Sequence, residues 1–176
     1  MNKKAITFGI IAVTIMSIGV LIPFWFFTPE MNKKWGEVAG YTVMILAMAT
    51  IFFAIRDHRR HQSELLSFKQ GLLFGTYVNF IASVLFAIFS YAIYAWIYPD
   101  FLQSYMDQSI EQVRNSTMDP NEIERQISEI EANKDFYLSP LMGGMLMFIT
   151  VFPIGLVVTI VSALLLKNDK VDQPVI

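Results

Sequence analysis

Residues 70–99 read QGLLFGTYVNFIASVLFAIFSYAIYAWIYP, thirty consecutive positions without an Asp, Glu, Lys or Arg. Three further segments, residues 5–29, 38–55 and 136–166, also lack these four residue types. Together the four segments cover 104 of the 176 residues. Each is close to or longer than the roughly 18–20 residues that a helix needs to cross a bilayer. Too few polar residues remain to cover four such segments in water, so the sequence predicts a membrane protein and excludes a soluble enzyme.

The overall composition supports the same class. Hydrophobic residues make up 55% of the chain and charged residues 16%, whereas soluble domains carry about 25% charged residues. The formal net charge of -2 argues against a nucleic-acid partner, which needs a basic surface. The chain has no cysteine, which excludes disulfides and thiolate metal sites. We therefore expect a lipid bilayer as the main partner and no cofactor.

The four segments should be helices, because lipid cannot hydrogen-bond exposed backbone groups and the segments are too long and too uniformly apolar for barrel strands. We predict spans at residues 5–27, 36–55, 70–98 and 138–166, forming one all-α transmembrane four-helix bundle over residues 1–176. The third helix is expected to begin at a capping box, in which Ser67 and Gln70 have the S-x-x-Q spacing.

Lys and Arg are unevenly distributed among the connections, and the cytoplasmic side of a membrane protein carries the excess. One side has eight: Lys3, Lys4, Arg56, Arg59, Arg60, Lys69, Lys167 and Lys170. The other side has five: Lys33, Lys34, Arg114, Arg125 and Lys134. We therefore predict a multi-pass protein of the bacterial inner membrane with both termini in the cytoplasm.

Aromatic residues provide an independent indication of the membrane boundary. Trp25, Trp35 and Trp96 all fall at the predicted outer ends of spans, where the rings of Trp and Tyr prefer the level of the lipid headgroups. Glu37 lies at the start of the second span, where a carboxylate suits the positive end of a helix. We interpret these four residues as interfacial.

Small and polar residues recur every four positions along the third span, at Gly71, Gly75, Asn79 and Ser83. Gly155 begins a similar series in the fourth span. Small residues allow two helices in a membrane to approach closely, and Asn or Ser can hydrogen-bond across the contact. The stripe either packs the protein's own helices together or forms an interface between subunits. We favour the first interpretation, because every multi-span protein needs such surfaces.

Residues 100–135 form the largest polar region, with nine acidic and three basic residues and a net charge of -6. Helical spacing of apolar residues predicts two helices with a turn at 115–119, their apolar stripes facing each other. The stripes comprise Leu102, Tyr105, Met106, Ile110 and Val113, then Ile123, Ile127 and Ile130. The first helix should continue the third span beyond Pro99, and Asp119 followed by Pro120 should start the second. This outer hairpin is either a binding module or a connector that pairs with itself.

The sequence has few features that are typical of transporters or enzymes. Apart from Glu37 at the start of the second span, no span contains a charged residue, whereas ion-coupled transporters usually have some. We interpret Asn79 as an interhelical hydrogen-bonding residue. His58 and His61 have a spacing that could bind a metal, but adjacent arginines disfavour a cation. We expect both to be solvated loop residues, and we identify no catalytic motif.

Five short motifs resemble those of a known family. They are GEVAGY at 36–41, SFKQG at 67–71, YPDF at 98–101, FPIGLV at 152–157 and SALLLK at 162–167. In this order and spacing they resemble the bacterial membrane family of domain of unknown function 4199, common in the Bacteroidota. The resemblance covers residues 5–167. It implies a four-helix inner-membrane protein and no reaction, substrate or cofactor.

These observations lead to a functional hypothesis. We predict a non-enzymatic accessory or scaffold component that engages a partner, either a second copy or another membrane protein, through its helices and acidic hairpin. The alternative is a passive pore or carrier for small or apolar solutes. A membrane enzyme acting on lipid is a third and weaker hypothesis, because only Glu37, His58 and His61 could serve it.

Overall fold

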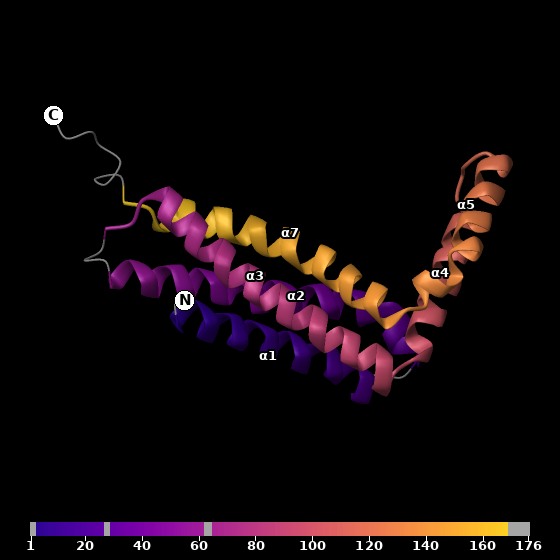
Figure 1. The fold of residues 1–176 in the computed structure, drawn as a ribbon, viewed down its shortest axis with the longest axis horizontal. Helices are drawn as coiled ribbons and strands as arrows, with labels where there is room; N and C mark the ends of the chain where they lie inside the picture. The colour runs from indigo at the N-terminus through magenta and orange to yellow at the C-terminus, as the bar shows by residue number, and fades with distance from the viewer. Residues whose placement is uncertain (1–2, 27–28, 62–64, 169–176) are drawn as a thin grey trace. The chain divides into compact units, whose positions relative to one another are not determined.

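The computed structural model describes residues 3–26, 29–61 and 65–168, without the side chains of 23–26, 29–34 and 37. The described residues form helices and turns and no strand (Figure 1). Four helices are long and apolar enough to cross a membrane. The prediction of an all-α helical bundle with four candidate spans is therefore confirmed.

The four long helices lie close to the predicted spans. They are α1 (Lys3–Phe26), α2 (Pro29–Arg60), α3 (Phe68–Ala92) and α7 (Pro140–Leu166), and α3 is extended by the π-helix η1 (Ile93–Ile97). Between η1 and α7 come α4 (Asp100–Arg114), α5 (Pro120–Ala132) and the single turn α6 (Lys134–Tyr137). The helix α2 extends beyond the predicted span 36–55 at both ends, from Pro29 to Arg60.

Two helix starts follow the local sequence. At α3, the backbone N–H of Ser67 donates to Gln70 Oε1 at 3.0 Å, and the N–H of Gln70 donates to Ser67 Oγ at 3.3 Å. The predicted capping box is confirmed. At α5, the Asp119 side chain accepts a hydrogen bond from the N–H of Asn121, and Pro120 occupies the first helical position. The predicted N-cap is also confirmed.

The predicted continuation of the third span beyond Pro99 is wrong. The helix ends at η1, and Tyr98 has φ -140° and ψ 62°, which is not helical. A proline disfavours the helical conformation at the preceding residue by steric conflict and has no N–H to donate. The helix α4 therefore begins anew after Pro99.

The chain divides into two compact units, one of Met1–Phe86 with Phe148–Ile176 and the other of Ala87–Met147. The first unit, called the bundle here, contains α1, α2, most of α3 and most of α7. Figure 1 shows these four helices running alongside one another. The second unit, called the hairpin unit, contains η1, α4, α5, α6 and the adjoining ends of α3 and α7.

In the bundle, α3 and α7 pack antiparallel through small residues. A Cβ placed at Gly71 would lie 3.3 Å from Ala163 Cβ, and one at Gly75 would lie 2.6 Å from Thr159 Cγ2. Four residues further along each helix, Asn79 of α3 lies opposite Gly155 of α7, because a Cβ at Gly155 would overlap Asn79. Matching four-residue steps on the two helices bring their backbones close together.

The other two helices of the bundle join the same packing. The helix α1 contacts α2 where Gly19 meets Val43, and it contacts α3 where Gly9 meets Ile81. The helix α2 places Ile55 beside Gly75 and Met48 beside Gly155. Glycines therefore mark contacts that involve all four helices, because a side chain at these positions would hold the helices apart.

The hairpin unit has a small core of its own around Tyr94. Tyr94 is buried in η1, and Leu102 and Met106 are buried in α4. A Cβ at Gly143 of α7 would overlap the Tyr94 ring and lie 3.1 Å from Leu102 Cδ2. Tyr94 also stacks on Phe101, with the ring centroids 5.1 Å apart. This core fixes the start of α4 against the beginning of α7.

We predict that Gly155→Ala destabilises the protein, because the added methyl group overlaps the Asn79 side chain. The free energy of unfolding should fall by about 1–3 kcal/mol, the usual cost of overpacking. Gly40→Ala is the matched control, since a Cβ there meets no atom within 4 Å, and it should be neutral or stabilising by up to about 1 kcal/mol. Thermal unfolding of both variants in detergent measures the difference, and equal stabilities would contradict the packing described.

Candidate functional site

The deepest polar cluster of the bundle is centred on Asn79. Its Nδ2 donates to the carbonyl oxygen of Phe152 at 2.9 Å, and Ser83 Oγ donates to Asn79 Oδ1 at 3.3 Å. Thr159 Oγ1 donates to the Gly155 carbonyl at 2.8 Å. Asn79, Ser83 and Thr159 all have an exposed fraction of 0%. The cluster therefore joins α3 to α7 through bonds within the protein.

The structure places all five predicted packing residues in the interior of the bundle. Gly71, Gly75, Asn79, Ser83 and Gly155 are buried. Gly71 and Gly75 lie against α7 of the same chain, and Gly155 lies against α3. Among the described residues, every fully buried side-chain nitrogen or oxygen atom has a hydrogen-bond partner. A second subunit would not reach the glycines without separating α3 from α7.

The predicted interfacial residues divide into two groups. Trp96 is 78% exposed and Trp35 is 52% exposed, which suits rings at the level of lipid headgroups. Trp96 lies edge-on to Tyr91 with the ring centroids 6.5 Å apart. Trp25 and Glu37 belong to helices, but their side chains lie outside the described part of the structure.

A second polar cluster lies where α1 begins and α2 ends. Lys4 Nζ donates to Asp57 Oδ2 at 2.6 Å, and it also lies 2.9 Å from His61 Nε2. His58 stacks face to face on Phe74 of α3, with the ring centroids 4.1 Å apart. The prediction of solvated loop histidines is wrong for His58, which lies half-buried in the last turn of α2. The described residues include no group of three or more metal-binding side chains.

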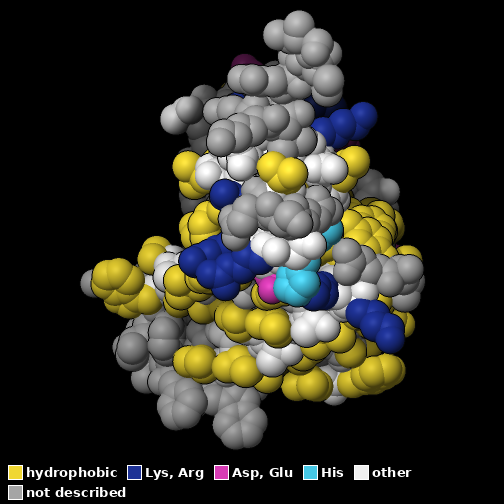
Figure 2. Space-filling model, turned by 90° about the vertical axis from the view of Figure 1, so that its left-hand side faces the viewer, with side chains coloured by type: hydrophobic (Ala, Val, Ile, Leu, Met, Phe, Trp, Pro, Cys, Tyr) yellow, Lys and Arg dark blue, Asp and Glu magenta, His cyan; other side chains and the backbone are white. Residues whose placement is uncertain are grey.

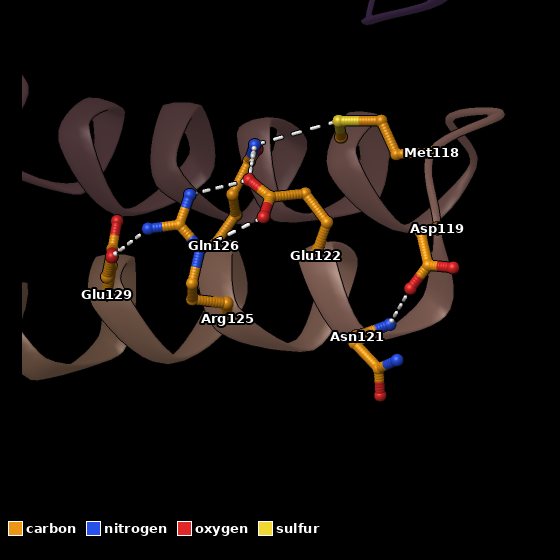
Figure 3. A network of polar contacts seen from close by, with 7 residues as sticks. All are labelled: Met118, Asp119, Asn121, Glu122, Arg125, Gln126 and Glu129. Atoms are coloured by element: carbon orange, nitrogen blue, oxygen red, sulfur yellow. Dashed lines mark hydrogen bonds and ion pairs between the residues drawn. The ribbon is translucent and has the colours of Figure 1, made fainter.

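The α5 helix of the hairpin unit carries a network of charged side chains (Figure 3). Arg125 donates to both carboxylate oxygens of Glu122, at 2.6 and 3.0 Å, and to Glu129 Oε1 at 2.8 Å. Gln126 Nε2 donates to Glu122 Oε1 at 2.9 Å and lies 3.6 Å from the sulfur of Met118. The three- and four-residue spacings bring these side chains onto one face of the helix.

The network changes the acidity of Glu122. The hydrogen bonds from Arg125 lower the pKa of Glu122 from 4.5 to about 2, with Gln126 adding to the shift. The same contact raises the pKa of Arg125. Glu122 therefore stabilises the folded helix as a carboxylate above pH 4.5, and this contribution is lost as the pH falls towards 2. The groups are exposed, so the network contributes little to overall stability.

The hairpin has a groove beside the C-terminal end of α4. It is lined by Arg114, Pro120, Ile123, Glu124, Ile127, Ser128 and Glu131. Pro120, Ile123 and Ile127 provide apolar surface, Glu124 and Glu131 contribute two carboxylates, and Arg114 contributes one guanidinium.

The predicted apolar stripes of the hairpin pair only in part. The helices α4 and α5 are in contact, but no residue of α5 is buried. Tyr105 is 51% exposed, so its prediction as a residue of the stripe facing α5 is wrong: it stacks instead towards Phe101, on its own helix. The hairpin therefore presents apolar side chains that are half covered.

Sequence reasoning missed two of these contacts. The Arg125 network could have been found from the spacing of Glu122, Arg125 and Glu129, which favours ion pairs on one helix face. The contact between Lys4 and Asp57 joins residues far apart in the chain, and no local pattern indicates it. Only the antiparallel packing of α1 and α2 brings these two side chains together.

The sequence of the chain matches a protein family described as protein of unknown function, DUF4199, over residues 7–168. The chain belongs to the DUF4199 family. The match covers all four long helices and the hairpin, so the family extends over both units. No curated protein and no solved structure matches the chain.

We predict that Arg125→Gln raises the pKa of Glu122 from about 2 towards its ordinary value of 4.5, because the variant loses the paired hydrogen bonds from the guanidinium. An NMR titration of the labelled glutamate carboxyl groups in detergent micelles measures this pKa. Arg114→Gln is the control with the same charge change, since Arg114 lies on α4 and not on the helix that carries the network. An unchanged pKa of Glu122 in Arg125→Gln would contradict the network.

Proposed function

We propose that this DUF4199 protein is a non-enzymatic component of the membrane that recruits a protein partner through the α4–α5 hairpin. The observation that carries the proposal is the surface of α5, a folded helix that buries none of its residues. A helix that served only as a connector would gain stability by burying its isoleucines. Here Ile123 and Ile127 instead line a groove edged by carboxylates.

The charge of the hairpin indicates the chemistry of the partner. Residues 100–135 carry a net charge of -6, and the Arg125 network involves only two of the carboxylates, Glu122 and Glu129. Glu124 and Glu131 stay exposed at the groove. We propose a partner with a basic, partly apolar segment, because complementary charge increases the rate and specificity of association.

The packing of the bundle supports a structural role for its buried polar groups. A carrier needs polar groups that a solute can reach, whereas Asn79, Ser83 and Thr159 have no exposed surface and are bonded within the protein. This arrangement favours the scaffold proposal over the passive pore or carrier. It also explains the polar residues of α3 without a catalytic role.

We further propose that the protein lies in the inner membrane with both termini in the cytoplasm and the hairpin on the opposite side. The connections on the proposed cytoplasmic side contain eight basic and four acidic residues, a net charge of +4. This asymmetry agrees with the excess of Lys and Arg found in cytoplasmic connections. The partner of the hairpin would then lie in the outer compartment or project into it.

The partner proposal predicts a specific crosslink from the groove. A photoreactive amino acid at Ser128, activated in native membranes, should form an adduct with one protein that has an exposed basic segment. Glu124→Lys with Glu131→Lys should reduce this adduct at least about tenfold, because the change places like charges in the interface. Mass spectrometry of the adduct identifies the partner and the crosslinked segment.

The matched control for this experiment is Asp107→Lys with Glu111→Lys, which makes the same charge change on α4 outside the groove lining. The adduct should persist in this variant. Equal loss in both variants, or crosslinks from Ser128 to lipid alone, would contradict recruitment through the groove. A crosslink to a protein that has no basic segment would contradict the proposed chemistry.

The orientation is tested by reporter fusions. A reporter that is active only outside the cytoplasm should be inactive when fused after Lys167 and active when inserted in the 115–119 turn. The expectation follows from the distribution of Lys and Arg. Reporter activity after Lys167 would show that the orientation is the opposite one, with the hairpin in the cytoplasm.

A further inference from the structure

One end of the bundle carries a surface of exposed basic residues that the hairpin proposal does not use. We call it the basic end face and define it by Arg56 and Arg60 of α2 and Lys69 of α3, all exposed. The stacking of His58 on Phe74, 4.1 Å between ring centroids, places the last turn of α2 beside the first turns of α3. In Figure 2, which views this end, Lys and Arg side chains lie among hydrophobic ones and around a histidine.

The described carboxylate of the bundle is paired with a lysine that is not part of the basic end face. Asp57 is the only acidic residue of the bundle whose side chain the structure describes, and Lys4 pairs with it at 2.6 Å. Among the described residues, no ion pair of Arg56, Arg60 or Lys69 is found. The guanidinium groups of Arg56 and Arg60 are thus available to an external anion, and guanidinium binds phosphate oxygens with paired hydrogen bonds.

Two of the three basic side chains, Arg60 and Lys69, lie in line with exposed apolar residues of their own helices. On α2, Leu46, Phe53 and Arg60 follow one another at seven-residue steps, and the first two are 62% and 54% exposed. On α3, Leu73 lies one helical turn from Lys69 and is 62% exposed. A molecule lying along either stripe would meet apolar side chains first and a positive charge at the end.

We propose that the basic end face binds the phosphate groups of anionic phospholipids, with the acyl chains lying along the apolar stripes of α2 and α3. Apolar contact and phosphate recognition at one site require an amphiphilic anion, which a phospholipid is. Basic residues immediately beside a membrane span attract anionic headgroups. The long side chains of Arg and Lys can rest on the apolar surface while the charged groups reach the headgroup level.

The test uses the purified full-length protein in neutral detergent. Native mass spectrometry follows the binding of phosphatidylglycerol and of phosphatidylcholine as each lipid is titrated. We expect the protein to prefer phosphatidylglycerol. The double variant Arg56→Gln with Arg60→Gln should weaken that binding about tenfold or more and leave the binding of phosphatidylcholine unchanged. Circular dichroism checks that the variant keeps its helix content.

The matched control is Arg114→Gln with Lys134→Gln, which removes two basic charges from the hairpin unit. It should bind phosphatidylglycerol like the unchanged protein. Equal weakening in both variants, or no preference between the two lipids, would overturn the proposal. If glycerol phosphate bound as tightly as phosphatidylglycerol, the acyl chains would contribute nothing to binding, and the proposed phospholipid site would be contradicted. Binding of an acidic peptide in preference to phosphatidylglycerol would assign the surface to a protein partner instead.

Discussion

The close approach of α3 and α7 is the contact on which the bundle depends. Glycines on both helices remove the side chains that would hold them apart, and the space at Gly155 is taken by the amide of Asn79. That amide bonds to the carbonyl of Phe152, the residue before Pro153. Because lipid offers no competing hydrogen bonds, a polar side chain at this depth must find its partner within the protein. Asn79 therefore joins α3 to α7, and its side chain explains why a glycine, Gly155, lies opposite it.

The hairpin unit is organised by different forces. Its core is small and centres on Tyr94, which the π-helix η1 places against Gly143 and Leu102. Each hydrogen bond of a π-helix spans one more residue than in an α-helix, so the π-helix changes which residues face inward. Further along, α5 begins at an N-cap, carries ion pairs between its own exposed side chains and has no buried residue. Such a helix can fold while keeping its surface available, which suits an element that meets a partner.

The two proposals assign different partners to surfaces of opposite charge. The bundle has its described acidic side chain paired and Arg56 and Arg60 exposed at one end, whereas the hairpin unit has an excess of carboxylates. A surface that combines apolar contact with phosphate recognition suits a lipid, and one that combines apolar contact with carboxylates suits a basic protein segment. A net charge of only -2 for the whole chain conceals this division.

The sequence alone predicted the long helices and two helix starts, which depend on local chemistry. Uninterrupted apolar stretches predicted the four long helices, because the bilayer permits no other backbone for them. Ser67 and Gln70 predicted the start of α3, and Asp119 with Pro120 predicted the start of α5, since a cap forms between residues three or fewer positions apart. The prediction that the third helix continues beyond Pro99 is wrong, although the effect of Pro99 on Tyr98 is itself local.

Only the tertiary structure decided which neighbour each side chain on a helix face contacts. The stripe of Gly71, Gly75 and Asn79 could have faced a second subunit, and the register of α7 determines that it faces the same chain. His58 could have been solvated, and the proximity of Phe74 determines that it is stacked. Lys4 and Asp57 pair only because α1 and α2 run antiparallel. Helical periodicity defines the face on which a residue lies, whereas its neighbour on that face depends on how separate helices pack.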